Sequence, residues 1–540
     1  MKASLEFRRG RVAVLFGLAL SAVARPAVDG YPRQPAFDVW HYRLRLEFAE
    51  ASDHIQGEAT LAVIVRDAGD STLHLNLKSM TVTQVLSGRQ RLAFTPDAEG
   101  LTVTLPPHRR RGDTLAVTIA YHGVPQEGLV MRKNKFGRRV IFADNWPDYS
   151  RHWFPGIDHP SDKAAVDFHL TLPAHYTVVA NGRLVAVTDA APGMKVWHWR
   201  ERAPIPTYCM VFGAAAFAVT HLPTTTGVPV AIYAYPEDAA DVNLQLSRTA
   251  AMLEFFTNRF GVFPYEKLAL VQAATRYGGM ENAGAIFLAE QSFGKDREVE
   301  HTAAHEIAHQ WFGDAVTPGD WHHLWLSEGF ATYGTALFYE HIAGPAEYRA
   351  VLRDQRAGYL QAASRNPAPI LDTTITDYRR LLSANNYAKA AWVLHMLRGV
   401  VGESHFGEGM RRYYSQFKHG TALSSDFQAV MEKVSGMDLA WFFAQWLQQP
   451  GHPELQVDWQ WQPARRQVQV RIRQTQSGAL FRLPLQVALQ VKGREARHEQ
   501  WIAEREVTFA LPAQAAPEAL VIDPEEKILM QVQVRKTGQL

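Results

Sequence analysis

The sequence predicts a multidomain α+β protein with an N-terminal antiparallel β domain, a mainly helical middle domain and a small C-terminal β-sandwich. Apolar residues alternate from about residue 36 to 220, as in Leu61, Val63 and Val65, which indicates half-buried strands. From about residue 240 to 448 they recur at helical spacing. Alternation returns after the Gln449-Pro-Gly turn. We therefore expect domains at residues 31–222, 223–448 and 449–540.

Length and composition are those of an ordinary globular protein. The chain has 540 residues, of which 47% are hydrophobic and 20% charged, and its formal net charge is +2. This charge provides no strong field for nucleic acid, and we expect none as a partner. The single cysteine, Cys209, cannot form an internal disulfide, and its apolar neighbours indicate a buried thiol.

The first 24 residues have the order of a secretory signal peptide. Basic residues precede an apolar run from Val12 to Leu20, and Ala22-Val-Ala24 provides small residues for cleavage. Removing residues 1–24 changes the formal charge from +2 to −1. We expect an exported protein, periplasmic or secreted, without stable membrane association after cleavage. The alternative is that the segment stays on the chain as an anchor, although its apolar run is short for a membrane span.

A candidate zinc site begins with His305-Glu-Ile-Ala-His309, which lies in a run without Pro or Gly until Gly313. On a helix, residues i and i+4 share a face, so both imidazoles can bind one ion, and Glu306 lies beside it as a candidate general base. Glu328 follows on the next predicted helix, and a helical hairpin can return it to the histidines. Two imidazoles and one carboxylate are the ligands of a catalytic zinc, so we expect one Zn2+ held by His305, His309 and Glu328.

These motifs together resemble the zinc aminopeptidase family that includes aminopeptidase N and leukotriene hydrolase. The resemblance rests on Gly278-Gly-Met-Glu-Asn282, on His305-Glu-x-x-His309, and on Glu328 after eighteen intervening residues. It extends to Phe37-Asp-Val-x-His-Tyr42, Arg151-His-Trp-Phe-Pro155 and Trp446-Leu-Gln-Gln-Pro-Gly451. It implies a thermolysin-like catalytic domain in a short, three-domain member of the family.

The resemblance also implies roles for further residues. Glu281 grips the free α-amine of a peptide substrate, with Gly278, Gly279 and Met280 forming the same binding segment. Tyr387 is the phenol that stabilises the oxyanion. In many relatives a Gln or Glu upstream of the Arg that corresponds to Arg151 also contacts the amine. This chain departs from that pattern, and the segment Asp144 to Asp148 offers Asn145 as the candidate at a shifted spacing. The implied activity is removal of N-terminal residues from peptides.

Three hypotheses remain open at this point. The first is an aminopeptidase. The second keeps the zinc but changes the substrate, as in an endopeptidase or an epoxide hydrolase of the same family. The third is a non-catalytic scaffold that binds peptides through its β domains, against which the presence of Glu306 and Tyr387 argues.

Overall fold

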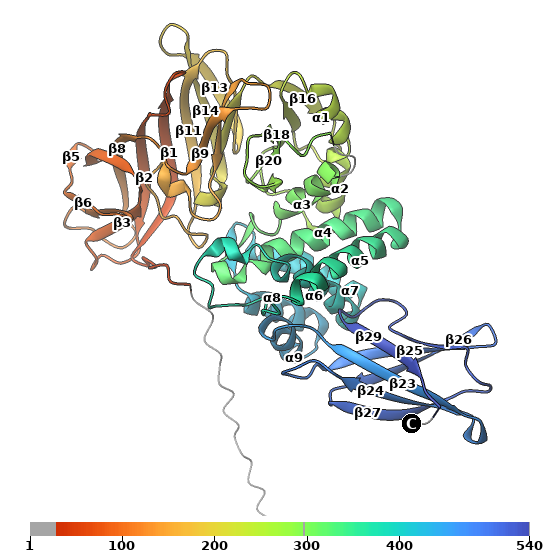
Figure 1. Ribbon diagram of the computed structural model, residues 1–540. Coiled ribbons are helices and arrows are strands. Elements are labelled where there is room, and N and C mark those ends of the chain that lie inside the picture. The colour runs from red at the N-terminus through yellow and green to blue at the C-terminus, as the bar shows by residue number, and fades with distance from the viewer. Residues whose placement is uncertain (1–28, 295–297, 539–540) are drawn as a thin grey trace, which may run out of the picture.

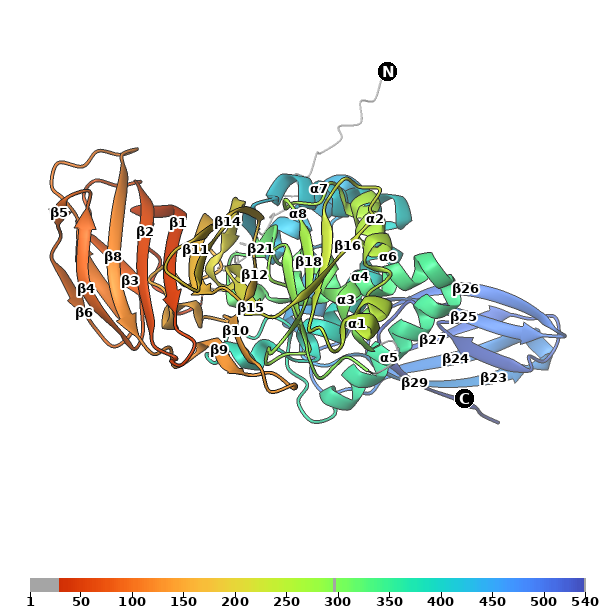
Figure 2. The ribbon, with the colours of Figure 1, turned by 90° about the horizontal axis from the view of Figure 1, so that it is seen from above.

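The computed structural model describes residues 29–294 and 298–538. The predicted signal peptide lies outside the described residues. Two β-rich parts stand at opposite ends of the molecule, with the helical part between them (Figures 1 and 2). This arrangement confirms the predicted fold class.

The N-terminal part is built from β-sheets. Its largest sheet has the order β13 (Arg183–Asp189), β14 (Met194–Pro206), β11 (Lys163–Pro173), β1 (Phe37–Phe48), β2 (Ile55–Val65), β8 (Thr114–Gly123), β4 (Met80–Ser87), β5 (Gln90–Arg91). Two smaller sheets have the orders β3 (Thr72–Asn76), β7 (Gly100–Thr104), β6 (Phe94–Pro96) and β12 (Thr177–Ala180), β15 (Phe212–Ala215), β10 (Arg139–Asp144), β9 (Gly128–Lys133).

The large sheet departs from the predicted antiparallel pattern at one pair of strands. β1 pairs in parallel with β11, with Tyr42 opposite Val166 and Leu44 opposite Phe168. All four side chains are fully buried. More than a hundred residues, which include β2, β4, β5 and β8 of the same sheet, separate these two strands, and such a long connection allows a parallel pairing that a tight hairpin cannot make.

The middle part contains a small mixed sheet next to its helices. The strand order is β16 (Ala218–Leu222), β17 (Val230–Ala234), β18 (Leu268–Ala273), β20 (Ala285–Ala289), β19 (Gly279–Met280). β16 pairs with β17, so this strand belongs to the middle sheet although the predicted boundary at residues 222 and 223 assigns it to the N-terminal domain. Alternation marks a strand but does not say which sheet the strand joins.

Helices make up most of the middle part, as predicted. They are α1 (Ala239–Gln245), α2 (Thr249–Phe260), α3 (Glu298–His309), α4 (Trp325–Ala343), α5 (Pro345–Ala363), α6 (Ala390–Val401), α7 (Glu403–Phe417), α8 (Ser424–Ser435) and α9 (Ala440–Phe443). π-Helical turns cover Asn385–Lys389 and Ala444–Gln448, and the short strands β21 (Val316–Pro318) and β22 (Gly420–Ala422) pair in parallel. α4 is buried along most of its length, so it forms the centre of this part.

The C-terminal part consists of two facing sheets. Their orders are β27 (Glu506–Pro512), β24 (Gln467–Gln474), β23 (Glu454–Gln462), β29 (Gln531–Lys536) and β26 (Arg494–Ile502), β25 (Leu483–Val491), β28 (Ala519–Ile522). Alternating residues of both sheets, such as Val470, Ile472, Leu485 and Val487, are fully buried between them. Within the described residues, the search for a helix long and apolar enough to cross a bilayer found none.

Candidate active site and metal centre

The predicted zinc ligands converge where α3 ends and α4 begins. His305 and His309 lie one turn apart on α3, with their Nε2 atoms 3.0 Å apart. Glu328 is in the first turn of α4, and its Oε2 lies 3.3 Å from the Nε2 of His305 and 3.3 Å from that of His309. The three side chains therefore meet at one point, as the sequence predicts.

The connection between the two helices explains this convergence. Gly313, four residues beyond the end of α3 at His309, takes a φ of 128°, a conformation that favours glycine. The Asp320 side chain accepts a hydrogen bond from the backbone nitrogen of His322 and caps the short turn Trp321–His323 that leads into α4. The chain thus reverses over residues 310–324, a connection that includes β21 and the turn Trp321–His323. Because His309 ends one helix and Glu328 begins the next, the reversal brings them together.

The spacing of these atoms fits a zinc ion. Ligands about 2.1 Å from a tetrahedral ion lie about 3.4 Å from one another, close to the observed separations of 3.0 and 3.3 Å. The Nδ1 of His309 lies 3.2 Å from the Phe312 carbonyl oxygen and 3.0 Å from the Ser327 Oγ. An Nδ1–H that donates to the carbonyl leaves the Nε2 lone pair free for the metal.

The acidic groups around His309 also favour the binding of a cation. The carboxyl groups of Glu281, Glu306 and Glu328 surround it in a buried environment. Burial alone lowers the pKa of His309, but these carboxyl groups raise it to about 10. Burial raises the pKa of Glu281 to about 7 and that of Glu306 well above its ordinary value. Burial also favours a raised pKa for Glu328, but His309 and His305 lower it to about 2. His309 would give up its proton to hold a divalent ion, whose charge would balance these carboxylates.

Glu281 reaches the same place from the small sheet of the middle part. It follows β19, and its carboxylate lies within 4.8 Å of ligand atoms of Glu306 and His309. The backbone of Gly279 passes directly over Glu306, because a Cβ at this position would lie 2.2 Å from Oε1 of Glu306. The predicted binding segment therefore runs along the general-base candidate.

A cavity of about 570 Å³ joins these groups. It is lined by every predicted site residue except one: His305, Glu306, His309, Glu328, Glu281, Gly278, Gly279, Met280 and Tyr387. The ring of Tyr387 lies parallel to that of His305, with the centroids 5.9 Å apart and an angle of 9° between the planes. Tyr387 belongs to the π-helical turn Asn385–Lys389, a conformation common at functional sites.

Asn145 is the exception, and its predicted role in substrate binding is wrong in this structure. Its side chain is fully buried, donates to the carbonyl oxygens of Thr207 and Met210 at 3.3 and 2.8 Å, and accepts from the Trp153 indole at 2.8 Å. It does not line the cavity. These bonds hold the buried amide inside the N-terminal domain and away from the cavity, so the side chain does not contact a substrate bound there.

The neighbouring Trp146 lines the cavity instead. Its ring meets that of Tyr277 edge to face at 6.0 Å, and both stand beside the Gly278 turn. His301, Thr302, Thr332, Gln355, Leu382 and Ala388 complete the lining, and the sequence analysis did not identify them. For His301 and Thr302 the helical spacing to His305 provides a signal, since both lie within one turn of it on α3.

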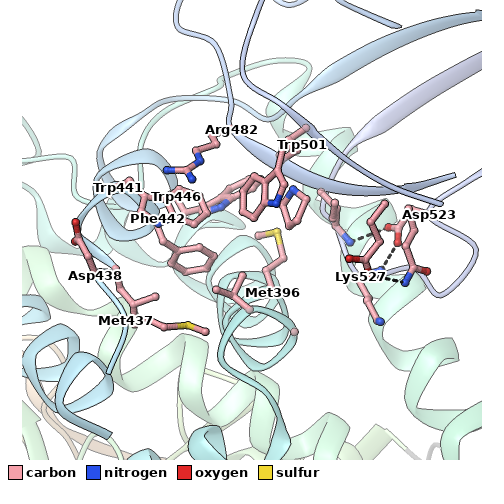
Figure 3. Close-up of a pocket in the computed structure, with 18 residues that line it drawn as sticks. Met396, Met437, Asp438, Trp441, Phe442, Trp446, Arg482, Trp501, Asp523 and Lys527 are labelled. Carbon is pink, nitrogen blue, oxygen red and sulfur yellow. Dashed lines mark hydrogen bonds between the residues drawn. The ribbon is translucent and has the colours of Figure 1, made fainter. Parts of the chain in front are cut away.

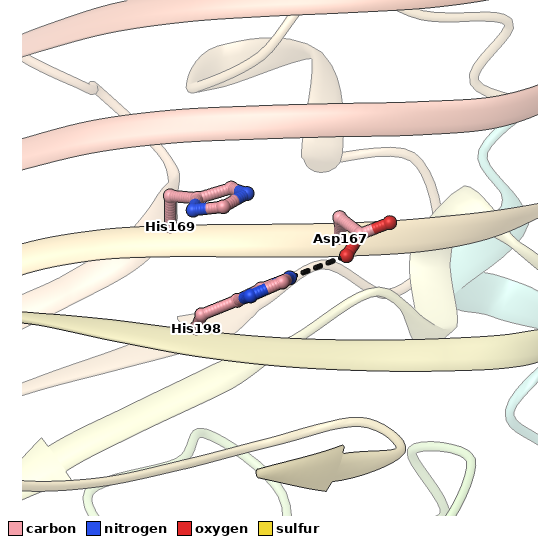
Figure 4. Close-up of side chains that lie close together, drawn as sticks. All are labelled: Asp167, His169 and His198. Carbon is pink, nitrogen blue, oxygen red and sulfur yellow. Dashed lines mark hydrogen bonds and ion pairs between the residues drawn. The ribbon is translucent and has the colours of Figure 1, made fainter. Parts of the chain in front are cut away.

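A second cluster of potential metal ligands lies on the outer face of the large sheet (Figure 4). The carboxylate of Asp167 is already occupied: His41 Nε2 lies 2.8 Å from Oδ2, and His198 Nε2 and Arg200 Nε lie 2.5 and 2.7 Å from Oδ1. The His169 and His198 rings stack at 4.1 Å. Burial lowers the pKa of His169 to about 4. A guanidinium bound to the only carboxylate repels a second cation, so we assign this cluster to sheet stability.

Comparisons with known proteins identify the family. The model of the peptidase M1 N-terminal domain matches residues 39–209, and that of the peptidase family M1 domain matches residues 244–446. The chain belongs to the peptidase M1 family. The resemblance found in the sequence is thereby confirmed, and zinc is the expected cofactor of the site.

Individual relatives are distant. The chain is 25% identical to a glutamyl aminopeptidase of Rattus norvegicus over 77% of its own length and 48% of the relative's. It is 26% identical to a puromycin-sensitive aminopeptidase of Caenorhabditis elegans over 81% of its length and 50% of that protein's. The chain thus spans about half the length of these curated relatives.

Solved structures of one bacterial family member match over nearly their whole length and over 78% of this chain. The crystal structure of an M1 zinc metallopeptidase from Deinococcus radiodurans superposes with a TM-score of 0.67 and 27% identity, covering 78% of this chain and 95% of that one. A mutant of the same enzyme, bound to a Tyr-Ser-Ala substrate, matches with a TM-score of 0.67 and 26% identity, covering 78% and 96%.

Proposed function

We propose that this M1 family member is a zinc aminopeptidase that removes residues from the free N-terminus of peptides. The observation that carries the proposal is the place of Glu281, whose carboxylate lies within 4.8 Å of ligand atoms of Glu306 and His309 inside the cavity. A carboxylate fixed there pairs with an α-ammonium group and limits cleavage to the first peptide bond. The aminopeptidase relatives and the Tyr-Ser-Ala complex of the bacterial enzyme support it.

His305, His309 and Glu328 would hold the zinc ion. When bound, zinc supplies Lewis-acid chemistry that makes water a stronger nucleophile and polarises the scissile carbonyl. Glu306, which lines the cavity next to these ligands, takes the proton of the attacking water and passes it to the leaving amine. Burial raises the pKa of the Glu306 carboxyl, which suits a group that must hold and then release this proton.

Tyr387 donates its phenolic hydrogen to the tetrahedral oxyanion. Burial raises the pKa of Tyr387 well above its ordinary value, so the phenol keeps its proton at neutral pH. Glu281, in the same cavity, holds the α-ammonium group of the substrate. The apolar surfaces of Trp146, Tyr277 and Met280 line the same cavity and exclude water from the first side chain of the substrate.

A comparison of free and blocked substrates tests the proposal. We expect the zinc-loaded enzyme to hydrolyse aminoacyl-aminomethylcoumarins, to lose activity with a chelator, and to reject the N-acetylated counterparts. Hydrolysis of blocked peptides at comparable rates would point to an endopeptidase. Absence of turnover in zinc-loaded protein on a full panel of residues would favour the peptide-binding scaffold.

Two variants separate the roles of the glutamates. Glu306→Gln is expected to keep zinc and lose turnover, so a near-normal rate contradicts its role as general base. Glu281→Ala is expected to lower activity on free N-termini while zinc content stays constant. The exposed Glu254→Ala on α2 serves as the matched control. Parallel loss of zinc and activity in Glu281→Ala would mean that the residue supports the metal rather than the amine.

We also propose, from the sequence alone, that residues 1–24 direct export to a periplasmic or extracellular space. The basic residues, the apolar run and the Ala22-Val-Ala24 site support this. Mass spectrometry of protein recovered from each cell fraction tests it. The expected mature chain begins after Ala24, and an intact N-terminus on cytoplasmic protein would contradict the proposal.

A further inference from the structure

A second cavity, of about 470 Å³, lies between the helical part and the C-terminal sandwich (Figure 3). α6 contributes Met396, and the segment from α9 to the following π-helical turn contributes Phe442 and Trp446. The sandwich contributes Leu483 at the start of β25 and Trp501 on β26. Within the described chain this cavity shares no lining residue with the active-site cavity, so it is a separate site.

The cavity wall is mainly apolar. Met396, Phe442 and Trp446 are almost fully buried behind it, whereas Met437 and Trp501 at its edge are 44% and 50% exposed. Apolar surface that stays open to solvent in a concave place is typical of ligand sites, and this volume lies within the range of about 300 to 1,000 Å³ usual for small molecules.

Arg482 is fixed at this cavity by aromatic rings and by its backbone. Its guanidinium carbon lies 4.9 Å from the centre of the Trp441 ring and 4.8 Å from that of Trp501, and these two indoles from different domains meet edge to face at 5.9 Å, so the cation packs against both. The Arg482 backbone nitrogen donates to Gln445 Oε1 at 2.6 Å, and Gln445 Nε2 donates back to the Arg482 carbonyl oxygen at 3.3 Å. The ring contacts and the hydrogen bonds with Gln445 restrict the conformations of Arg482 before a ligand binds, so binding costs less conformational entropy.

The N–H groups of the Arg482 guanidinium are available to bind a ligand. Among the described residues it has no hydrogen-bond acceptor and no carboxylate partner, whereas Lys527, the other basic residue in the cavity lining, pairs with Glu525. A planar guanidinium with open N–H groups is suited to bind a carboxylate with two hydrogen bonds.

The lining has three acidic residues, Asp438, Glu499 and Asp523, and the exposed Glu499 accepts only a 3.5 Å contact from Gln486 Nε2. Asp438 accepts from the backbone nitrogen of Ala440 at 2.9 Å. Asp523 accepts from the backbone nitrogens of Lys527 and Ile528 at 2.9 and 2.8 Å. Arg482 is therefore the basic residue of the lining whose donors stay open, and an anion can bind at this one point of the cavity.

We propose that this cavity binds an amphipathic carboxylate, with the apolar body against Met396, Phe442 and Trp446 and the carboxylate on Arg482. Two sources share this chemistry: a free aliphatic or aromatic acid, and the C-terminal carboxylate of a peptide that ends in an apolar residue. Residues of both domains form the site, because Trp441 of the helical part and Trp501 of the sandwich contact the same guanidinium.

Calorimetric titration of the zinc-loaded enzyme with octanoate, octanamide and octylamine tests the proposal. These probes share one apolar chain and differ in charge. We expect saturable binding of octanoate about tenfold tighter than that of octanamide, since a charge-assisted pair adds roughly 1.4 kcal/mol. Octylamine is expected to bind most weakly. Binding of octylamine as tight as that of octanoate, or no saturable binding of octanoate, would overturn the proposal.

Variants of the arginine locate the binding. Arg482→Met is expected to abolish the preference for octanoate over octanamide while octanamide still binds, which shows that the cavity is intact. Arg482→Lys is expected to keep part of the preference. The exposed Arg494→Met on β26, outside the cavity lining, is the matched control. Octanoate binding that survives Arg482→Met unchanged would place the ligand elsewhere, for instance at the zinc site, and would contradict the proposal.

A last arm distinguishes the two sources. Acetyl-Gly-Leu and its C-terminal amide are blocked at the N-terminus, so the proposed aminopeptidase site does not retain them. If acetyl-Gly-Leu binds more tightly than octanoate and depends on Arg482, the ligand is a peptide C-terminus. If octanoate binds more tightly, it is a free acid. These experiments measure binding and do not require turnover, so their outcome does not depend on the result of the aminopeptidase assay.

Discussion

Gln310 ties Glu281 to the end of the zinc-ligand helix: its Nε2 donates a hydrogen bond of 2.5 Å to the Glu281 carbonyl oxygen. Its Oε1 accepts from the backbone nitrogen of Gly284 at 2.7 Å, and its side chain is fully buried. One amide therefore fixes the position of the proposed amine-binding segment relative to His309, which directly precedes Gln310.

Replacing this amide tests its role in positioning. We expect Gln310→Met, which keeps the length of the side chain, to raise KM for free N-terminal peptides about tenfold while zinc content stays normal. The two stranded backbone groups also lower the free energy of unfolding by about 2 to 4 kcal/mol. Steady-state kinetics, metal analysis and urea unfolding measure these effects. The control is Gln428→Met, whose amide donates to Glu432 on the surface of α8. Loss of zinc in proportion to activity would refute a role confined to Glu281.

The phenol of Tyr387 gives a prediction about the chemical step. We expect Tyr387→Phe to lower kcat by about 100-fold to 1,000-fold, because an oxyanion donor is worth roughly 3 kcal/mol in the barrier. KM and zinc content stay close to those of the parent, because phenylalanine preserves the parallel packing on His305 at 5.9 Å. Single-turnover kinetics with a saturating peptide make the measurement. A kcat within a few-fold of the parent's would exclude the hydroxyl as the donor.

Local spacing accounts for the part of the site that was predictable. His305 and His309 share a face because any α-helix places i and i+4 together, and the reversal to α4 places Glu328 beside them. Glu281 and Tyr387 are different, because nothing local assigns a role to a glutamate in a glycine-rich turn or to a tyrosine at a helix start. For these two, the family resemblance carried the prediction, and the structure places both in the cavity.

Long-range contacts explain what the sequence did not reveal. Asn145 and Trp146 are neighbours, and which of them faces the cavity depends on hydrogen bonds from Asn145 to Thr207 and Met210, some 60 residues away. Gln310 has no distinguishing pattern either, since its partners come from the turn after β19. The position of β16 likewise follows from pairing with β17 and not from its alternation. Such choices are made by tertiary packing, which a single sequence does not display.

The second ring nitrogen of His309 yields a prediction about metal affinity. Ser327 Oγ lies 3.0 Å from Nδ1, and the Phe312 carbonyl oxygen lies 3.2 Å from it. Ser327→Ala leaves the carbonyl as the remaining partner, so the imidazole is held less firmly. We expect the zinc dissociation constant to rise about threefold to tenfold, with kcat unchanged once zinc is saturating. Competition with a fluorescent chelator measures the constant. An unchanged constant would show that the carbonyl alone orients the ring.

His395 gives a prediction about pH and stability at the junction with the C-terminal sandwich. Its Nε2 lies 3.0 Å from the Glu526 carbonyl oxygen and its Nδ1 lies 2.8 Å from the Tyr348 hydroxyl, so a neutral ring satisfies both contacts. Burial lowers the pKa of His395 from 6.5 to about 4. A group whose pKa is lowered by folding stabilises the folded state above its unfolded pKa. That contribution is lost as the pH falls from about 6.5 to about 4.

The lost contribution amounts to roughly 3 kcal/mol at pH 4, given about 1.4 kcal/mol for each pH unit between the two pKa values. His395→Gln removes the titrating ring. We therefore expect the parent's advantage in unfolding free energy over this variant to be constant above pH 7 and to shrink by about that amount at pH 4. Urea unfolding of both proteins between pH 4 and 8 makes the measurement, with the exposed His175→Gln as control. A difference that stays constant across this range would mean that His395 is protonated as readily in the folded chain as in the unfolded one, because only an equal pKa in both states removes the pH dependence.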